Sequence, residues 1–278
     1  MTSSIKKVAI IGTGVIGTGW IIRTLAHNKI VNAYDKNSKV EKKIKEEIKR
    51  TWPYVKRLFK KKKLNLKNFK FFTSIKEAVH KVDFIQECAT ENYALKIKLM
   101  KEIANYAKKN AIISSSSSGL LPTKIYSKCY NPSRGLIGHP FNPVYMCPGV
   151  EIVPGKKTNR KFILKTDKFY KSISMNPIIL KKELPGYLAD RLQEALWREA
   201  LHIVNDGYAT TKDLDRSIED GPGLRWSLMG VFLTYHLAGG NAGMKHMLKQ
   251  FGPALKLPWT KLKAPALTAK LSSRVIKG

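Results

Sequence analysis

The sequence predicts an α/β protein: a doubly wound, mostly parallel β-sheet followed by a smaller all-helical C-terminal domain. A buried-strand pattern at residues 5–11 leads directly into the glycine-rich turn Gly12–Gly17. Short apolar runs then alternate with helix-length stretches as far as residue 154, a pattern typical of parallel strands joined by right-handed helical crossovers. After Pro185-Gly186 the pattern is helical only.

The length and composition are those of a soluble globular protein. A chain of 278 residues with 43% hydrophobic content can bury two modest cores, so we expect two domains, residues 1–183 and 184–278. No stretch is long and apolar enough to predict a membrane span. The cysteines Cys88, Cys129 and Cys147 lack metal-ligand or redox spacing, which favours a reducing compartment and a cytoplasmic location.

The formal net charge of +31 is unusual. Such a field attracts polyanions without specific contacts. The lysines are scattered along the chain, however, and only Lys60–Lys63 forms a run. Because no nucleic-acid-binding signature accompanies that run, we predict neither a specific nucleic-acid partner nor a membrane partner. A general lysine bias and a functional attraction of anions both remain open.

The glycine-rich turn predicts a Rossmann-type dinucleotide site. Gly12 makes the tight turn, Gly14 lets the backbone approach a pyrophosphate, and Gly17 lets the helix pack on the strand. The N-terminus of the following helix then meets the phosphate charge. The predicted phosphate-binding residues are Gly12, Gly14, Val15, Ile16 and Gly17.

A second apolar strand at residues 30–34 ends in Asp35, at the spacing expected for a ribose-binding carboxylate. A carboxylate there accepts hydrogen bonds from both ribose hydroxyls and repels a 2′-phosphate. The sequence therefore predicts NAD rather than NADP, although the neighbouring Lys36 weakens that preference.

The remaining predicted elements continue the alternation. Helices are expected at residues 15–28, 37–62 and 92–108, and strands at 69–72, 83–88, 111–115, 134–139 and 151–154. Ligands of such sheets lie at the carboxyl ends of the strands. That edge would carry Asp35, the segment Cys88–Asn92, the serine run Ser114–Ser118 and His139.

The pentapeptide His139–Pro143 contains the candidate for general base. A neutral imidazole accepts a proton near physiological pH, and a carboxylate partner, here Glu151, orients the ring and raises its basicity. Ser118 offers a hydroxyl donor on the same predicted edge. A histidine beside proline is also a common structural residue, so the segment alone leaves both interpretations open.

Together these motifs resemble the L-3-hydroxyacyl-CoA dehydrogenase superfamily, over almost the whole chain. The matching residues, in order, are Gly12, Gly14, Gly17, Glu91-Asn92, Ser118, His139, Asn142-Pro143 and Glu151. The resemblance implies NAD as cofactor, with Glu91 and Asn92 on its side of the site. It also implies that His139, paired with Glu151, removes a hydroxyl proton, while Ser118 binds the substrate oxygen and Asn142 lines the pocket. The helical domain would form a homodimer and close the cleft.

The C-terminal half is similar to the carnitine 3-dehydrogenase branch of that superfamily, through residues 186–207, 221–244 and 250–262 and through Trp52-Pro53. This likeness implies NAD-dependent oxidation of the 3-hydroxyl of L-carnitine to 3-dehydrocarnitine. The alternatives are a short-chain L-3-hydroxyacyl-CoA dehydrogenase, a sugar-acid dehydrogenase related to lambda-crystallin, and a non-catalytic polyanion-binding protein that keeps the fold as a scaffold.

Asp190 departs from the acyl-CoA pattern, which usually has asparagine at this place. A carboxylate there either favours a cationic substrate or pairs with Arg191 or Arg198. A trimethylammonium group is attracted to aromatic faces, and Phe141, two residues from the candidate base, is the best placed aromatic residue. We therefore count Phe141 and Asp190 as substrate-binding candidates. The histidines lack the paired spacing of a metal site, and no metal is expected.

Overall fold

The computed structural model describes residues 5–60, 63–253, 260, 263, 266 and 268–271. Lys61, Lys62 and most of the segment 254–262 therefore lie outside the described residues. In the described part, one sheet holds the strands β1 (Lys7–Ile11), β2 (Ile30–Tyr34), β3 (Phe69–Phe72), β4 (Phe84–Glu87), β5 (Ile112–Ser115), β6 (Gly135–Pro140), β7 (Gly149–Pro154) and β8 (Asn176–Ile179).

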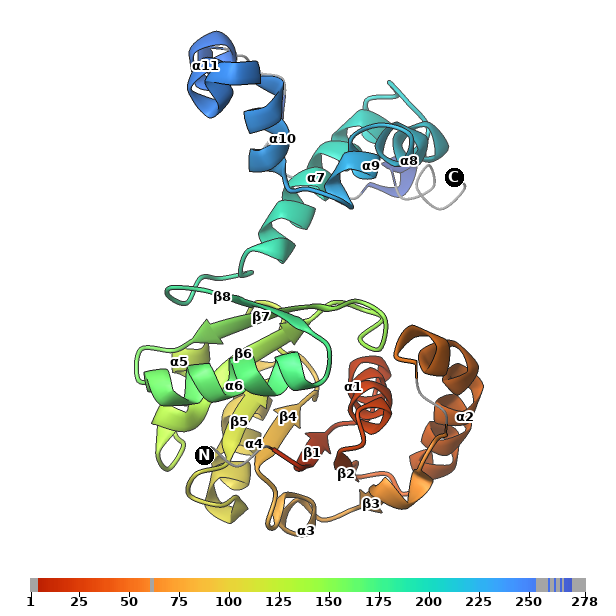
Figure 1. Cartoon of the computed structure of the whole chain (residues 1–278), viewed down its shortest axis with the longest axis vertical. Helices are drawn as coiled ribbons and strands as arrows, with labels where there is room; N and C mark the ends of the chain where they lie inside the picture. Colours follow the sequence, from red (N-terminus) through yellow and green to blue (C-terminus); the bar gives the residue numbers. More distant parts are fainter. Residues whose placement is uncertain are drawn as a thin grey trace. The chain divides into compact units, whose positions relative to one another are not determined.

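The strand order is β3-β2-β1-β4-β5-β6-β7-β8 (Figure 1). All neighbouring pairs are parallel except β6 with β7. The order reverses between β1 and β4, and the crevice outside the carboxyl ends of strands at such a point is where ligands bind in open α/β sheets. This topology confirms the predicted fold class.

Helices cover both faces of the sheet. Alternate residues of β1 belong to two separate cores: Val8 and Ile10 to one, Ala9 and Ile11 to the other. Packed in the first core are α1 (Val15–Ala26), α2 (Val40–Leu58) and α6 (Arg160–Ser172). Packed in the second are α3 (Ile75–Val79), α4 (Tyr93–Tyr106) and α5 (Pro122–Ile125).

The connection between β6 and β7 sets the geometry of the candidate site. Residues 141–148 contain no helix, and a link this short suits an antiparallel pair, because parallel strands need a crossover of a dozen or more residues. The sequence did not lead us to predict α3, α6 or β8. The last is a four-residue edge strand that contains Pro177, which gives a weak strand signal.

The chain divides into two compact units, Met1–Asp190 and Arg191–Gly278. The division at 183/184 stays our prediction for the functional domains. Helix α7 (Ala189–Asn205) begins at the end of the first unit. The helices of the second unit that follow it are α8 (Thr211–Glu219), α9 (Pro222–Trp226), α10 (Val231–Ala238) and α11 (Gly243–Phe251). Among the described residues, no helix has the length and apolar character that a membrane crossing requires.

Candidate active site

His139 and Glu151 form a buried pair at the end of the sheet. They are directly opposite one another in the antiparallel register of β6 and β7. The Nδ1 atom of His139 is 2.8 Å from Glu151 Oε2, and the two residues are 6% and 0% exposed. Because the carboxylate can only accept, Nδ1 carries the hydrogen, which leaves the Nε2 lone pair of a neutral imidazole free to take a proton.

The second oxygen of Glu151 is held by the backbone. Its Oε1 accepts hydrogen bonds from the N–H groups of Leu188 at 2.9 Å and Ala189 at 3.1 Å. Burial by itself raises the pKa of Glu151, but the hydrogen bond from His139 and those from Ala189 and Leu188 outweigh burial and lower the pKa below its ordinary value. The carboxylate is thus kept ionised beside the imidazole.

Three side chains surround the ring of His139 besides Glu151. Asp190 Oδ2 lies 3.9 Å from Nε2, and the side chain of Asp190 is 29% exposed. Phe141 meets the imidazole edge to face with ring centroids 5.5 Å apart, and the buried Tyr187 lies at 5.6 Å. The structure thus brings His139, Glu151, Phe141 and Asp190 together, as the sequence predicted. Tyr187 was missed, since a tyrosine between glycine and leucine gives no periodic signal.

The serine run ends in a turn that is tied to Glu91. Glu91 Oε1 accepts hydrogen bonds from Ser117 Oγ, from Ser118 N at 2.9 Å and from Gly119 N at 3.4 Å. The hydroxyl that binds Glu91 thus belongs to Ser117, whereas the Ser118 residue is exposed and contributes its backbone N–H. We call residues 117–119 the serine turn.

The serine turn is connected to the segment that supports Glu151. The hydroxyl of Tyr187 donates to the carbonyl of Leu120 at 2.7 Å, and Gly186 N donates to the carbonyl of Gly119 at 3.4 Å. Leu188 and Ala189 of the same segment bind Glu151. Residues 186–189 therefore link the serine turn to the histidine pair.

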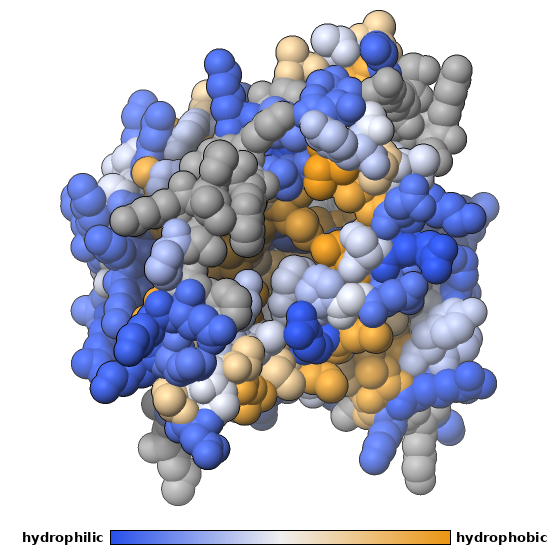
Figure 2. All heavy atoms as spheres, turned by 90° about the horizontal axis from the view of Figure 1, so that it is seen from above, coloured by the Kyte–Doolittle hydropathy of each residue, from blue (hydrophilic) through white to orange (hydrophobic). Residues whose placement is uncertain are grey.

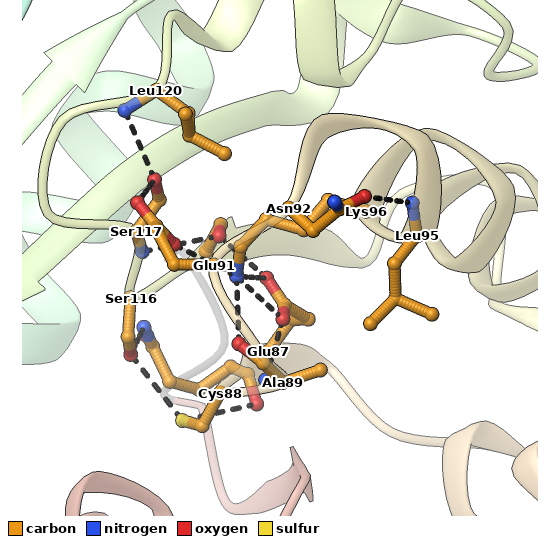
Figure 3. Close-up of polar contacts among 12 residues, drawn as sticks. Glu87, Cys88, Ala89, Glu91, Asn92, Leu95, Lys96, Ser116, Ser117 and Leu120 are labelled. Carbon is orange, nitrogen blue, oxygen red and sulfur yellow. Dashed lines mark hydrogen bonds and ion pairs between the residues drawn. The ribbon is translucent and has the colours of Figure 1, made fainter.

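A buried ion pair lies beside the turn (Figure 3). Lys96 and Glu87 are 1% and 0% exposed, and Lys96 Nζ lies 2.8 Å from Glu87 Oε1. The sequence analysis did not single out either residue, although a carboxylate within an apolar strand signals a buried partner. Asn92, predicted on the cofactor side, caps α4 by accepting a hydrogen bond from Leu95 N at 3.0 Å.

The three glycines of the first turn have three different geometries. Gly12 has a φ of +95°, which favours glycine, and a Cβ at Gly17 would lie 1.9 Å from the Gly12 carbonyl oxygen. A Cβ at Gly14 would meet no atom within 4 Å. Gly14 is also the N-cap of α1, and no side chain accepts a hydrogen bond there. The backbone at Gly14 is thus open to a ligand, and Val15 beside it is 73% exposed.

Asp35 lies at the end of β2, beside the glycine turn. Its Oδ2 accepts hydrogen bonds from Thr13 Oγ1 at 2.7 Å and Thr13 N at 3.2 Å, and Asn37 N donates to Oδ1 at 3.2 Å. A groove of about 650 Å³ is lined by Gly14, Val15, Asp35 and Asn142, among others. Thr13, which orients the carboxylate, was not recognised in the sequence.

The His139–Glu151 pair can accept and return a proton, and the groove beside the glycine turn has the chemistry to bind a nucleotide. The groove combines open backbone at a helix N-terminus with a carboxylate, which suits a dinucleotide's phosphates and ribose. Among the described residues, no cluster of histidine, cysteine, aspartate and glutamate could hold a metal ion.

Two family models match the chain. The 3-hydroxyacyl-CoA dehydrogenase NAD-binding domain matches residues 7–184, and the C-terminal domain of the same enzymes matches residues 186–277. The chain belongs to the 3-hydroxyacyl-CoA dehydrogenase family. The resemblance based on the sequence motifs is confirmed, and residues 7–184 are the family's NAD-binding domain.

The curated relatives of the chain within this family include L-carnitine dehydrogenases. The chain is 51% identical to the L-carnitine dehydrogenase of Oceanobacillus iheyensis, over 98% of this chain and 89% of that protein. It is 49% identical to the L-carnitine dehydrogenase of Pseudomonas putida, over 99% and 86%. Among solved structures, (S)-3-hydroxybutyryl-CoA dehydrogenase from Ralstonia eutropha is similar with a TM-score of 0.71 at 25% identity, over 88% of this chain and 85% of that chain.

Proposed function

We propose that this protein catalyses the NAD-dependent oxidation of the 3-hydroxyl of L-carnitine to a ketone. The observation that carries the proposal is the identity of about half the residues, over nearly the whole chain, to curated L-carnitine dehydrogenases. The buried His139–Glu151 pair, beside a nucleotide groove, supplies the general base that such a reaction needs.

His139 is the proposed general base. Its Nε2 accepts the hydroxyl proton of the substrate, and the positive charge that develops on the ring is stabilised by Glu151 at 2.8 Å. Because Glu151 is held by two backbone N–H groups as well, the imidazole keeps one orientation through the proton transfer. In the reverse direction the protonated His139 returns the proton.

The residues of the first turn fit NAD. Gly12, Gly14, Val15, Ile16 and Gly17 would receive the pyrophosphate at the N-terminus of α1, and Asp35 would accept hydrogen bonds from the adenosine ribose. When bound, the nicotinamide supplies the acceptor for the hydride of the carbinol carbon. Glu91 and Asn92 would complete the cofactor side, Glu91 by fixing the serine turn and Asn92 by fixing the start of α4.

The substrate side has separate groups for the oxygen and for the cation. Ser118, the exposed middle residue of the serine turn, would hydrogen-bond the substrate oxygen, and Asn142 would line the pocket from the loop after His139. The trimethylammonium group cannot donate hydrogen bonds, so it needs a carboxylate and an aromatic face. Asp190, 3.9 Å from the base, and Phe141, in contact with it, meet that need.

The second candidate function is oxidation of a short-chain L-3-hydroxyacyl-CoA. The observation that favours it is that both matching family models, over residues 7–184 and 186–277, are those of 3-hydroxyacyl-CoA dehydrogenases. The base and the cofactor site would serve both substrates equally.

A direct comparison of substrates tests the proposal. The purified protein is given NAD with L-carnitine or with L-3-hydroxybutyryl-CoA, and NADH formation is followed. We expect a larger kcat/KM with carnitine, and a loss of at least about a thousandfold in His139→Gln, within the range for general bases. Faster turnover of the thioester would overturn the choice of substrate. An active His139→Gln would overturn the base, with the exposed His80→Gln as control.

We also propose a homodimer formed through the second unit. Large apolar side chains of this unit are exposed to water, and among the described residues the most exposed are Leu228 at 84%, Phe232 at 83% and Tyr208 at 81%. Figure 2 shows apolar side chains gathered between hydrophilic ones on one face of the molecule.

The three cysteines are unpaired, which supports a reducing, cytoplasmic location.

A further inference from the structure

Arg23, in the second half of α1, is a buried cation to which the proposed mechanism assigns no role. The residue is 1% exposed. Arginine is almost never fully buried unless it is paired, because removing a charge from water is costly. In the described part of the chain, however, no carboxylate forms an ion pair with Arg23. Burial lowers the pKa of Arg23 to about 10, which leaves the guanidinium charged at neutral pH.

The guanidinium is held by four backbone carbonyl oxygens. Its Nε donates to the carbonyl of Val144 at 2.6 Å, and its Nη2 donates to that of Cys147 at 3.0 Å. Its Nη1 donates to the carbonyls of Ile173 at 3.0 Å and Ser174 at 2.8 Å. The first two acceptors belong to residues 141–148, which we call the β6–β7 loop, and the other two belong to the turn between α6 and β8. The guanidinium thus joins α1 to two separate segments.

The β6–β7 loop forms part of the candidate site. It begins directly after β6, the strand that carries the candidate base. Its residues Asn142, Pro143 and Tyr145 line the nucleotide groove, together with Gly14 at the start of α1. The hydrogen bonds of Arg23 therefore connect one wall of the groove to the helix that forms another.

The β6–β7 loop also packs closely on α1 (Figure 1). Val144 is fully buried, and a Cβ at Gly19 would lie 2.9 Å from the Cβ of Val144. Arg23 lies one turn after Gly19 on the same helix. The close approach of loop and helix at Gly19 thus brings the carbonyl of Val144 within reach of the guanidinium.

Arg23 supplies hydrogen bonds that the loop does not make for itself. Inside the loop, the N–H groups of Met146 and Cys147 both donate to the carbonyl of Pro143 at 2.9 Å. Among the described residues, the carbonyls of Val144 and Cys147 accept hydrogen bonds from Arg23 alone. A buried carbonyl that loses its donor makes that conformation less stable. Removing the guanidinium should therefore let the loop move away from α1.

We propose that Arg23 is a positioning residue that fixes the β6–β7 loop against α1 and so sets the place of Asn142 beside the nucleotide groove. Small displacements of groups that hold the reactants lower catalytic rates strongly. The effect on catalysis rests on the proposed function, whereas the fixing of the loop does not. The two halves therefore have separate tests.

Amide hydrogen exchange tests the structural half without any substrate. In Arg23→Met, which keeps a long side chain without donors, we expect the amides of Met146 and Cys147 to exchange at least about tenfold faster than in the unaltered protein. The amide of Ile10 in β1 reports any loss of global stability, and the tenfold change is counted beyond the change at Ile10. Arg57→Met, which removes an exposed arginine from α2, is the matched control and should leave all three amides unchanged.

If Arg23→Met does not fold, Arg23→Lys is measured instead. A lysine keeps the charge, but its three donors lie on one nitrogen and do not match the four acceptors of the guanidinium. We expect the same two amides to exchange at least about threefold faster in this variant. Exchange that does not change beyond the change at Ile10 would overturn the proposal.

Kinetics with L-carnitine and NAD test the functional half. In the variant that folds, we expect kcat, counted per NAD-binding site, to fall by at least about tenfold, and the Kd of NAD, measured by fluorescence, to change by less than about threefold. A purely structural role would lower the number of NAD sites and leave kcat per site unchanged, and that result would overturn the proposal. A rise in the NAD Kd of more than about tenfold with an unaltered kcat would also overturn it, because Arg23 would then act through cofactor binding.

The two tests also separate this inference from the proposed function. If the unaltered protein does not oxidise carnitine, the proposed function fails. Amide exchange then still decides whether Arg23 fixes the β6–β7 loop.

Discussion

At the residue scale, the candidate site depends on carboxylates whose surroundings differ. Glu151 is fully buried and has donors on both oxygens, whereas Asp190 is partly exposed and lies 3.9 Å from Nε2 of the same imidazole. One carboxylate can therefore orient the base while the other remains within reach of a cationic substrate.

Glu151→Gln should lower the stability of the protein in a pH-dependent way. The pKa of Glu151 is lowered in the folded state, so its contribution is present above the ordinary carboxyl value of 4.5 and is lost as the pH falls through the lowered value. We expect urea unfolding at neutral pH to show a free energy of unfolding that is lower by about 2–4 kcal/mol, because the variant lacks the buried carboxylate charge that His139 and two backbone N–H groups stabilise. The difference between the two proteins should shrink in acid, and a difference independent of pH would contradict this assignment.

Asp190→Asn should raise the KM for L-carnitine by about tenfold, equivalent to about 1.4 kcal/mol, with a smaller effect on kcat. The reason is that the amide cannot attract the trimethylammonium charge. The matched control is Glu194→Gln, an exposed carboxylate on the same helix. If the KM does not change, the alternative holds, in which Asp190 pairs with an arginine rather than with the substrate.

At the element scale, two glycines at the junction of β1 and α1 differ in what surrounds them, and we expect one to matter for folding and the other for ligand binding. Gly17 permits close packing of helix on strand, whereas Gly14 is open. We expect Gly17→Ala to lower the free energy of unfolding by about 3 kcal/mol or more, because its methyl group would overlap the Gly12 carbonyl. Gly14→Ala should unfold at nearly the same denaturant concentration.

Although Gly14→Ala should leave the stability nearly unchanged, it should weaken the binding of NAD. A methyl group at Gly14 would stand where the pyrophosphate approaches the backbone, so the Kd for NAD should rise by about tenfold or more. Titration calorimetry on the folded Gly14→Ala protein checks this result. Unaltered NAD affinity would show that the phosphates bind elsewhere.

At the scale of the whole molecule, the described part of the second unit exposes several large apolar side chains. Exposed apolar residues in α9 and α10, together with the segment between them, predict association. We expect the unaltered protein to be a dimer in light scattering, and the double variant Leu228→Asp/Phe232→Lys to be a monomer. Lys212→Asp, on a polar helix of the same unit, is the control, and a dimeric double variant would place the interface elsewhere.

The charge of +31 also belongs to this scale. A polyanion such as heparin should bind weakly and dissociate at moderate salt, because scattered lysines give a general field rather than a site. Binding that persists in high salt would revive the non-catalytic alternative.

The fold and much of the site follow from local pattern. The glycine turn, Asp35 after the second strand and the histidine pentapeptide each depend on residues close together in sequence, where turn chemistry and strand periodicity act directly. Predicted strands agreed with β1 to β7 within two residues at each end. The elements α3, α6 and β8 were missed because they are short or lie at the edge of the sheet, or because lysine-rich helix faces obscure the apolar stripe.

The sequence by itself determined the fold class, the family and the edge of the sheet at which its candidate residues lie, because parallel strands bring their carboxyl ends together whatever the side chains do. Only the tertiary structure decided which groups touch. The antiparallel pairing of β7 with β6 places Glu151 opposite His139. The hydroxyl bound to Glu91 belongs to Ser117 rather than to Ser118. Lys96 contacts the carboxylates of Glu87 and Glu91, which are four positions apart in the sequence. Such contacts depend on register and burial, which no local pattern encodes.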